Sequence, residues 1–208
     1  MSECLFQYGS VEDVFYLSHV RQDGPVSMAR NHFHSSYEIY YLISGQRYYF
    51  IKDKTFQVMG NDLILINKGD LHKTASCGES EHERLLINFK EEFLSPTIDT
   101  HEILLAPFKK DVNLIRFTMQ QQREVEHLLN KIQNELVQKR PAYMTYVQAL
   151  FMQFLIYIAR HVLDQEQSDT FRHPSLMHKK VSKIVRHINA HYMDPLTLNN
   201  VAQKFNLS

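Results

Sequence analysis

Short apolar runs rich in β-branched and aromatic residues recur through the first 118 residues. Turn-forming residues separate the runs, for example Ser44-Gly45, Gly60-Asn61 and Lys68-Gly69-Asp70. Branched and aromatic side chains fit the pleated surface of a sheet, so each run predicts a strand. The predicted strands are residues 38–43, 47–51, 55–59, 62–66 and 84–89. Many short strands at even spacing predict a β-sandwich or a β-barrel.

After about residue 120 the apolar positions follow the period of a helix. Five residues predict the buried side of a first helix: Val125, Leu128, Leu129, Ile132 and Leu136. Arg140-Pro141 ends this pattern because proline is tolerated at a helix start but not inside. A second helix is predicted from Tyr143 to Val162.

The second predicted helix is apolar on two sides. One side holds Tyr143, Val147, Leu150, Phe151, Phe154, Leu155, Ile158 and Val162, and the other holds Met144, Met152, Ile156 and Tyr157. A helix this apolar needs partners on two faces. Both faces can pack within one chain, or one face can contact a second subunit. We favour the second alternative and predict a homodimer contact through Leu150, Phe151, Phe154, Leu155 and Ile158.

A polar stretch over residues 164–173 is typical of a linker. Helical spacing resumes after Pro174, and Asp194-Pro195 interrupts it. Thr197 is a candidate N-cap for a short helix whose apolar face is Leu198, Val201, Ala202 and Phe205. We therefore divide the chain into a β domain (1–118), a helical dimerisation region with a linker (119–170) and a C-terminal piece (171–208).

Composition indicates a globular protein of the cytoplasm. Of the 208 residues, 44% are hydrophobic and 22% are charged, which excludes a disordered tail protein. The N-terminus has neither the basic nor the apolar region of a signal peptide. The most apolar stretch is interrupted by Thr145, Gln148 and Gln153, so no membrane span is expected. Two cysteines do not make a disulfide scaffold.

A net charge of zero conceals a basic C-terminal end. Residues 171–208 hold six Lys and Arg against one Asp, a net charge of +5. Such asymmetry indicates a nucleic-acid contact or a solvated basic face.

The densest candidate chemistry lies between Arg30 and His72. His32 and His34 flank Phe33, and Glu38 and His72 complete a set of three imidazoles and one carboxylate. Such a set can hold a divalent transition metal, or it can hydrogen-bond a polyhydroxylated or acidic ligand. Arg30 and Tyr40 are in phase with these residues along a strand, so they are weaker ligand-binding candidates, and Tyr49 is a further weak candidate.

Two blocks of this region resemble the cupin motifs. His32, His34, Glu38 and Gly45 have the spacing of the first motif. Asn61, Asn67, Gly69 and His72 match the second, with asparagine in place of its first glycine and of its proline. The resemblance implies a double-stranded β-helix, which is a small jelly roll, followed here by helices.

The C-terminal segment resembles the opening of the helix-turn-helix of AraC/XylS-type transcription regulators. Ile184, Ile188, Tyr192, Leu196, Leu198, Val201, Ala202, Leu207 and Ser208 match its apolar core and turn. The whole order, from cupin through two helices to a partial helix-turn-helix, is similar to that family. Its recognition helix would begin where these 208 residues end, so we expect them not to bind DNA sequence-specifically. In a full-length chain, phosphate contacts are expected from Lys179, Lys180, Lys183 and Arg186.

The resemblance implies a ligand-responsive transcription regulator rather than an enzyme. Its cupin domain would sense a small molecule, a sugar or a related metabolite, and its complete C-terminal domain would bind DNA. No cofactor is required, although the histidines can take a divalent transition metal. The alternative is a metal-dependent cupin enzyme, an oxygenase or isomerase, with His32, His34, Glu38 and His72 as ligands.

Overall fold

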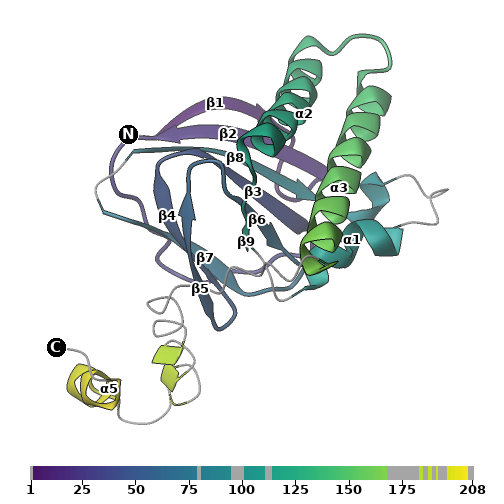
Figure 1. The fold of residues 1–208 in the computed structure, drawn as a ribbon. Coiled ribbons are helices and arrows are strands. Elements are labelled where there is room, and N and C mark those ends of the chain that lie inside the picture. The colour runs from purple at the N-terminus through teal and green to yellow at the C-terminus, as the bar shows by residue number, and fades with distance from the viewer. Residues whose placement is uncertain are drawn as a thin grey trace.

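The computed structural model describes most of the chain (Figure 1). The described residues are 2–78, 81–94, 101–110 and 114–167, then 183–184, 187–188, 191 and 196–205. In the described β region, two antiparallel sheets pack with helices α1 to α3 on the far side of the larger one. The predicted jelly-roll β domain followed by helices is confirmed.

The larger sheet has the strand order β1-β2-β8-β3-β6-β9. Its strands are β1 (Ser2–Tyr8), β2 (Phe15–Gln22), β3 (Tyr37–Ser44), β6 (Leu63–Ile66), β8 (His82–Phe89) and β9 (Leu114–Ile115). The smaller sheet has the order β5-β4-β7, from β4 (Gln46–Ile51), β5 (Lys54–Met59) and β7 (His72–Ser76). All five individually predicted strands are present, as β3, β4, β5, β6 and β8.

Strand β3 separates two cores because its side chains alternate between the two faces of the sheet. Tyr37, Ile39 and Tyr41 belong to a large apolar cluster shared with α1, α2 and α3. Tyr40 and Leu42 belong to a second cluster with residues of the smaller sheet. The helices and the smaller sheet therefore cover opposite faces of the larger sheet, as Figure 1 shows.

The two predicted helices are present as α2 (Met119–Gln138) and α3 (Tyr143–Gln167). A capping box between Thr118 and Gln121 starts α2, and Lys139 ends it in the left-handed conformation. The strand pattern did not predict α1 (His101–Lys109). That helix is only nine residues long and contains Pro107, so its sequence gives a weak helical signal.

The predicted dimer residues of α3 require a correction. Leu150, Phe151, Phe154, Leu155 and Ile158 are each at most 4% exposed within one chain. The ring of Phe151 lies 4.8 Å from that of Phe89 and 5.4 Å from that of Phe15, centroid to centroid, so this side of α3 packs on the sheet. These five residues form the core of the chain and not a subunit contact. The sequence pattern could not reveal which side of a doubly apolar helix the sheet covers.

The boundary predicted between residues 118 and 119 is not a boundary in packing, since the sheet and both helices share one core.

This packing also accounts for the apolar character of α3. Over Tyr143–Gln165 the helix is long and apolar enough to cross a membrane by length and composition alone. In this fold its most apolar side is covered by the sheet.

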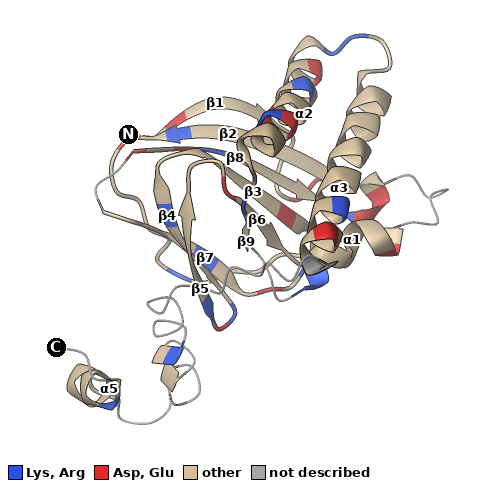
Figure 2. Ribbon diagram, in the orientation of Figure 1, with Lys and Arg blue, Asp and Glu red and all other residues tan. Residues whose placement is uncertain are grey.

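In the C-terminal segment the predicted short helix is present as α5 (Leu198–Lys204). Thr197 caps it by accepting a hydrogen bond from the backbone of Asn200, and Val201 is buried. Lys183 is exposed, whereas Lys179, Lys180 and Arg186 lie outside the described residues. Figure 2 shows basic positions and no acidic ones on the described part of this segment.

Candidate functional site

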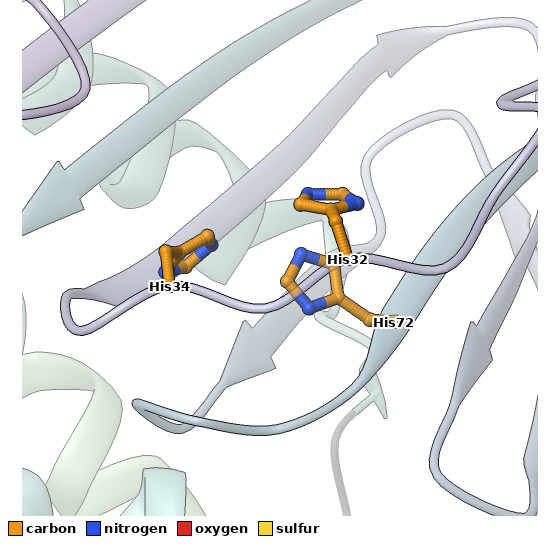
Figure 3. Close-up of side chains that lie close together, drawn as sticks. All are labelled: His32, His34 and His72. Atoms are coloured by element: carbon orange, nitrogen blue, oxygen red, sulfur yellow. The ribbon is translucent and has the colours of Figure 1, made fainter.

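Three histidines meet where the loop before β3 crosses β7. His32 pairs with His72 through two backbone hydrogen bonds of 2.9 Å, which bring the loop against the strand. The ring centroids of His32 and His72 are 4.2 Å apart, and those of His34 and His72 are 5.0 Å apart. One ring nitrogen from each histidine lies within 4.8 Å of the others (Figure 3). The motif spacing therefore does bring these side chains together.

Glu38 is buried beside the histidines and accepts several hydrogen bonds. Its carboxylate lies 3.1 Å from Nε2 of His34 and 2.7 Å from the hydroxyl of Tyr49. Nε2 of His72 is 3.6 Å away, beyond hydrogen-bond distance but close enough for a charge interaction. Burial by itself raises the pKa of a carboxyl group, but these partners outweigh burial and hold the pKa of Glu38 well below its usual range. Glu38 is therefore an ionised acceptor at neutral pH.

Backbone carbonyl groups hold the Nδ1 atoms of two of the histidine rings. Nδ1 of His34 lies 2.9 Å from the carbonyl of Ser36, and Nδ1 of His72 lies 2.7 Å from that of Asp70. A carbonyl only accepts, so each Nδ1 carries a hydrogen. The hydrogen bond from Nε2 of His34 to the ionised Glu38 needs a second ring hydrogen and therefore favours the protonated ring. Burial lowers the pKa of His34, but the hydrogen bond and the charge of Glu38 outweigh burial and raise it. Nε2 of His72 is buried without a hydrogen-bond partner among the described residues. Ring nitrogens of the histidines and the carboxylate of Glu38 thus converge, and once the proton of His34 is released they form an arrangement that attracts a metal ion.

The histidine cluster is one end of a cavity of about 530 Å³ between the two sheets. This volume lies within the usual range for small-molecule sites. Exposed residues surround its mouth, namely Val11, Glu12, Met28 and Phe33. Its interior is lined by both polar and apolar side chains: His32, His34, Glu38, Tyr40, Tyr49, Thr74, Arg84, Leu86 and Asn88.

The three weaker ligand-binding candidates predicted from the sequence do not all lie at the cavity. Tyr40 and Tyr49 line the cavity, and their rings are 5.0 Å apart. Arg30 is exposed and is not among the lining residues, because its segment is a bend rather than a strand and the period-two alternation does not apply. His72 does not line this cavity directly but supports it through Glu38 and His32.

Sequence reasoning missed two polar residues of the site, Arg84 and Asn88 on β8. The register of β8 against β3 pairs Asn88 with Glu38, Leu86 with Tyr40 and Arg84 with Leu42. All six side chains therefore face the same side of the sheet. The sequence does carry a signal for these two residues. They are the two polar positions in the apolar run 84–89, and because they stand four residues apart they share one face of the strand.

Comparison with known proteins shows the family to which the chain belongs. The chain belongs to the AraC-like ligand binding domain family, whose model matches residues 14–155. The chain is 24% identical over 175 residues to the uncharacterized HTH-type transcriptional regulator YbfI of Bacillus subtilis. It is 21% identical over 160 residues to the HTH-type transcriptional activator RhaR of Mannheimia succiniciproducens. These matches cover 83% and 71% of this chain, but only 59% and 56% of the relatives.

A solved structure supports the fold over nearly the whole length. The AraC-like transcriptional activator CuxR aligns with 94% of this chain and 67% of its own, with a TM-score of 0.53 and 8% sequence identity. At this identity the match indicates a shared fold. The family predicted from the sequence is thereby confirmed by the family model, and the predicted order of a β domain followed by helices is confirmed by the fold.

Proposed function

We propose that this protein is a cytoplasmic, ligand-responsive DNA-binding transcription regulator that senses a small molecule in the cavity between its sheets. The cavity carries the proposal, since it combines a suitable volume, a histidine cluster and buried polar groups with the ligand-binding family of the chain. Its binding groups suit a hydroxylated metabolite such as a sugar or a sugar derivative. Histidine and carboxylate groups can accept hydrogen bonds from hydroxyls, and tyrosine and asparagine can donate them.

Strand β3 offers a route from the cavity to the helices. Glu38 and Tyr40 line the cavity, while Ile39 and Tyr41 between and beside them face the helical core. The hydroxyl of Tyr41 donates a 3.1 Å hydrogen bond to Glu126 of α2. A ligand that contacts Glu38 or Tyr40 better in one position of β3 would shift the position of α2. We infer that effector binding changes how the C-terminal domain is presented to DNA.

A thermal-shift screen of hydroxylated and acidic metabolites tests this function. A ligand at 100 times its dissociation constant stabilises the folded state by about 2.7 kcal/mol. The matched variant is Leu86→Trp, which places an indole ring in the cavity. We expect a stabilising compound for the unchanged protein and loss of the effect in the variant. A compound that stabilises both chains equally would place its site elsewhere.

The histidine end of the cavity fits a divalent transition metal. The converging ring nitrogens favour it, as does Nε2 of His72, which is buried and lies 3.6 Å from the carboxylate of Glu38. His32, His34 and His72 with Glu38 would hold the ion, and the bound ion would supply a Lewis acid that orients ligand oxygens.

We expect protein purified without chelators to contain about one transition-metal ion per chain, and His34→Ala to lose most of it. The loss follows because His34 supplies one of the converging nitrogens. Elemental analysis measures the content, and His127→Ala on the exposed side of α2 is the matched control. Equal metal content in His34→Ala and the unchanged protein would contradict this site.

The same cluster favours a second candidate function, a metal-dependent cupin enzyme of the oxygenase or isomerase type. Histidine and carboxylate ligands hold the metal in non-haem iron oxygenases, and this cluster offers both kinds of ligand. Turnover decides between the two functions. The compound found by thermal shift should be recovered unchanged after incubation with metal-loaded protein, whereas its conversion would establish the enzyme.

We further propose a homodimer through the outer side of α3. Tyr146, Ile156 and Leu163 are exposed there and lie within about 100° of one another around the helix axis. We expect Ile156→Glu together with Leu163→Glu to give monomers in sedimentation, since charges are costly in an apolar contact. Asn130→Glu on the exposed side of α2 should leave the dimer intact. A monomeric unchanged protein at high micromolar concentration would contradict the contact.

A further inference from the structure

The far end of the cavity from the histidines carries an unbalanced positive charge. Arg84 is the only Lys or Arg among the described residues that line the cavity. No carboxylate of a described residue lies within 4.0 Å of its guanidinium, and its hydrogen bond to the hydroxyl of Ser18 is a long one, 3.4 Å. Arg84 is half-buried, and charged groups that are shielded from water are normally paired. This guanidinium therefore has donors available on the cavity side.

The guanidinium of a second arginine lies near this end of the cavity, beside Tyr40, but does not line the cavity. Arg47 is buried, and its partners are the carbonyl of Val26 and the hydroxyls of Thr74 and Ser76, all of them neutral. The two arginines make this end of the barrel electropositive. Their field is reflected in His82 nearby, where burial together with Arg47 and Arg84 lowers the pKa to about 4. At the histidine end of the cavity, the negative charge of Glu38 is paired with His34.

Tyr40 adds an unused hydrogen-bond donor beside Arg84. The guanidinium carbon of Arg84 lies 5.9 Å from the centroid of the Tyr40 ring. Tyr40 is 1% exposed. The guanidinium of Arg47 can donate only to the oxygen of this hydroxyl, and no group of the described residues accepts its O–H. Burial raises the pKa of this hydroxyl to about 12, so it stays protonated and can donate. Orphaned buried polar groups are rare in folded proteins and need a partner.

We propose that the effector carries a carboxylate, which the guanidinium of Arg84 and the hydroxyl of Tyr40 hold at the end of the cavity opposite the histidines. This inference rests on the proposed function and names the chemical class of its ligand. The planar fork of arginine matches a carboxylate with two parallel hydrogen bonds. A single lining guanidinium balances the one negative charge of a carboxylate better than the two of a phosphate.

The register of β8 gives the ligand two separate polar ends. Arg84 and Asn88 are four residues apart on one face, which corresponds to about 13 Å along a strand. Leu86 lies between them and provides an apolar floor. A hydroxylated acid, such as a sugar acid, can thus place hydroxyls near the histidines and its carboxylate near Arg84, once the long arginine side chain extends toward it.

Acetate and acetamide are matched probes for this site because they have nearly the same shape and differ in charge. Each is added to ¹⁵N-labelled, chelator-treated protein at constant ionic strength, and the arginine side-chain NMR signals are followed. We expect saturable, millimolar binding of acetate at Arg84 and no comparable binding of acetamide. Chelator treatment removes any metal to which acetate could bind at the histidines.

Three variants complete the test. Arg84→Met should weaken acetate binding at least tenfold, and Arg84→Lys should retain part of it. Lys73→Met, which removes a cation near Phe50 outside the cavity lining, should bind acetate as the unchanged protein does. If Arg84→Met does not fold, as judged by its amide spectrum, acetate binding is compared between Arg84→Lys and the unchanged protein instead.

Equal binding of acetate and acetamide, or undiminished acetate binding by Arg84→Met, would overturn the proposal. Inorganic phosphate is the third probe, and phosphate binding at Arg84 that is at least tenfold tighter than acetate binding would replace the carboxylate by a phosphate. The regulator function is judged separately by the thermal-shift screen. A neutral stabilising compound whose effect is unchanged in Arg84→Met would leave that function standing and remove only the carboxylate.

Discussion

Glu38→Ala is expected to destabilise the protein by about 3–5 kcal/mol and to abolish ligand binding. The substitution leaves the buried hydroxyl of Tyr49 and Nε2 of His34 without their carboxylate partner, and breaking a buried charged network has this cost. Chemical denaturation measures the free energy of unfolding, and calorimetric titration with the compound from the thermal-shift screen measures binding.

Glu12→Ala is the matched control, because Glu12 lies at the exposed mouth of the same cavity. It should change stability by less than about 0.5 kcal/mol. Acidification offers a second check. Since the pKa of Glu38 is depressed in the folded protein, its stabilising contribution is complete above about pH 4.5, the value of a free glutamate, and is lost as the pH falls below it. A Glu38→Ala protein as stable as the Glu12→Ala protein would contradict the network described.

Gly45→Ala is expected to destabilise the protein by about 3 kcal/mol or more. Gly45 joins β3 to β4 with a φ of +91°, a conformation that costs an alanine about 1–2 kcal/mol. An added Cβ would also lie 2.4 Å from the carbonyl oxygen of Glu81 and 2.8 Å from Cβ of His82, so β8 would have to move. Overpacking of this kind costs a further 1–3 kcal/mol.

Gly69→Ala separates the two causes. Gly69 also has a positive φ, +79°, but a Cβ there would meet nothing within 4 Å. It should therefore cost only the conformational part, about 1–2 kcal/mol, in the same denaturation experiment. Similar losses in both variants would mean that the close approach of Gly45 to β8 is unimportant.

The sequence predicted the elements of this fold better than their contacts. Residues such as Ile39 and Leu65 lie in runs whose composition alone predicts strands, and the spacing of His32, His34, Glu38 and His72 predicted their convergence. Such features are local or carried by a motif. The side of α3 that packs on the sheet depends instead on contacts between distant segments, for example between Phe151 and Phe89.

The same distinction explains the errors at the site. The local pattern places Arg84 and Asn88 on one face of a strand, but only the register between β3 and β8 shows that this face lines the cavity. Arg30 was expected there because a strand was assumed before His32. The chain forms a bend at that point, so Arg30 lies at the surface. Pairing register and backbone geometry, rather than residue type, decided which arginine lines the cavity.

We propose that ligand occupancy of this cavity controls transcription. The most direct measurement is expression of a reporter driven by the DNA upstream of the genes neighbouring its own, in cells that make the protein from its natural gene. The effector should change expression about tenfold, within the usual range of coupling between sites. Leu86→Trp, made at the same level, should leave expression insensitive to the effector. Equal effector responses in the unchanged protein and in Leu86→Trp would contradict the claim.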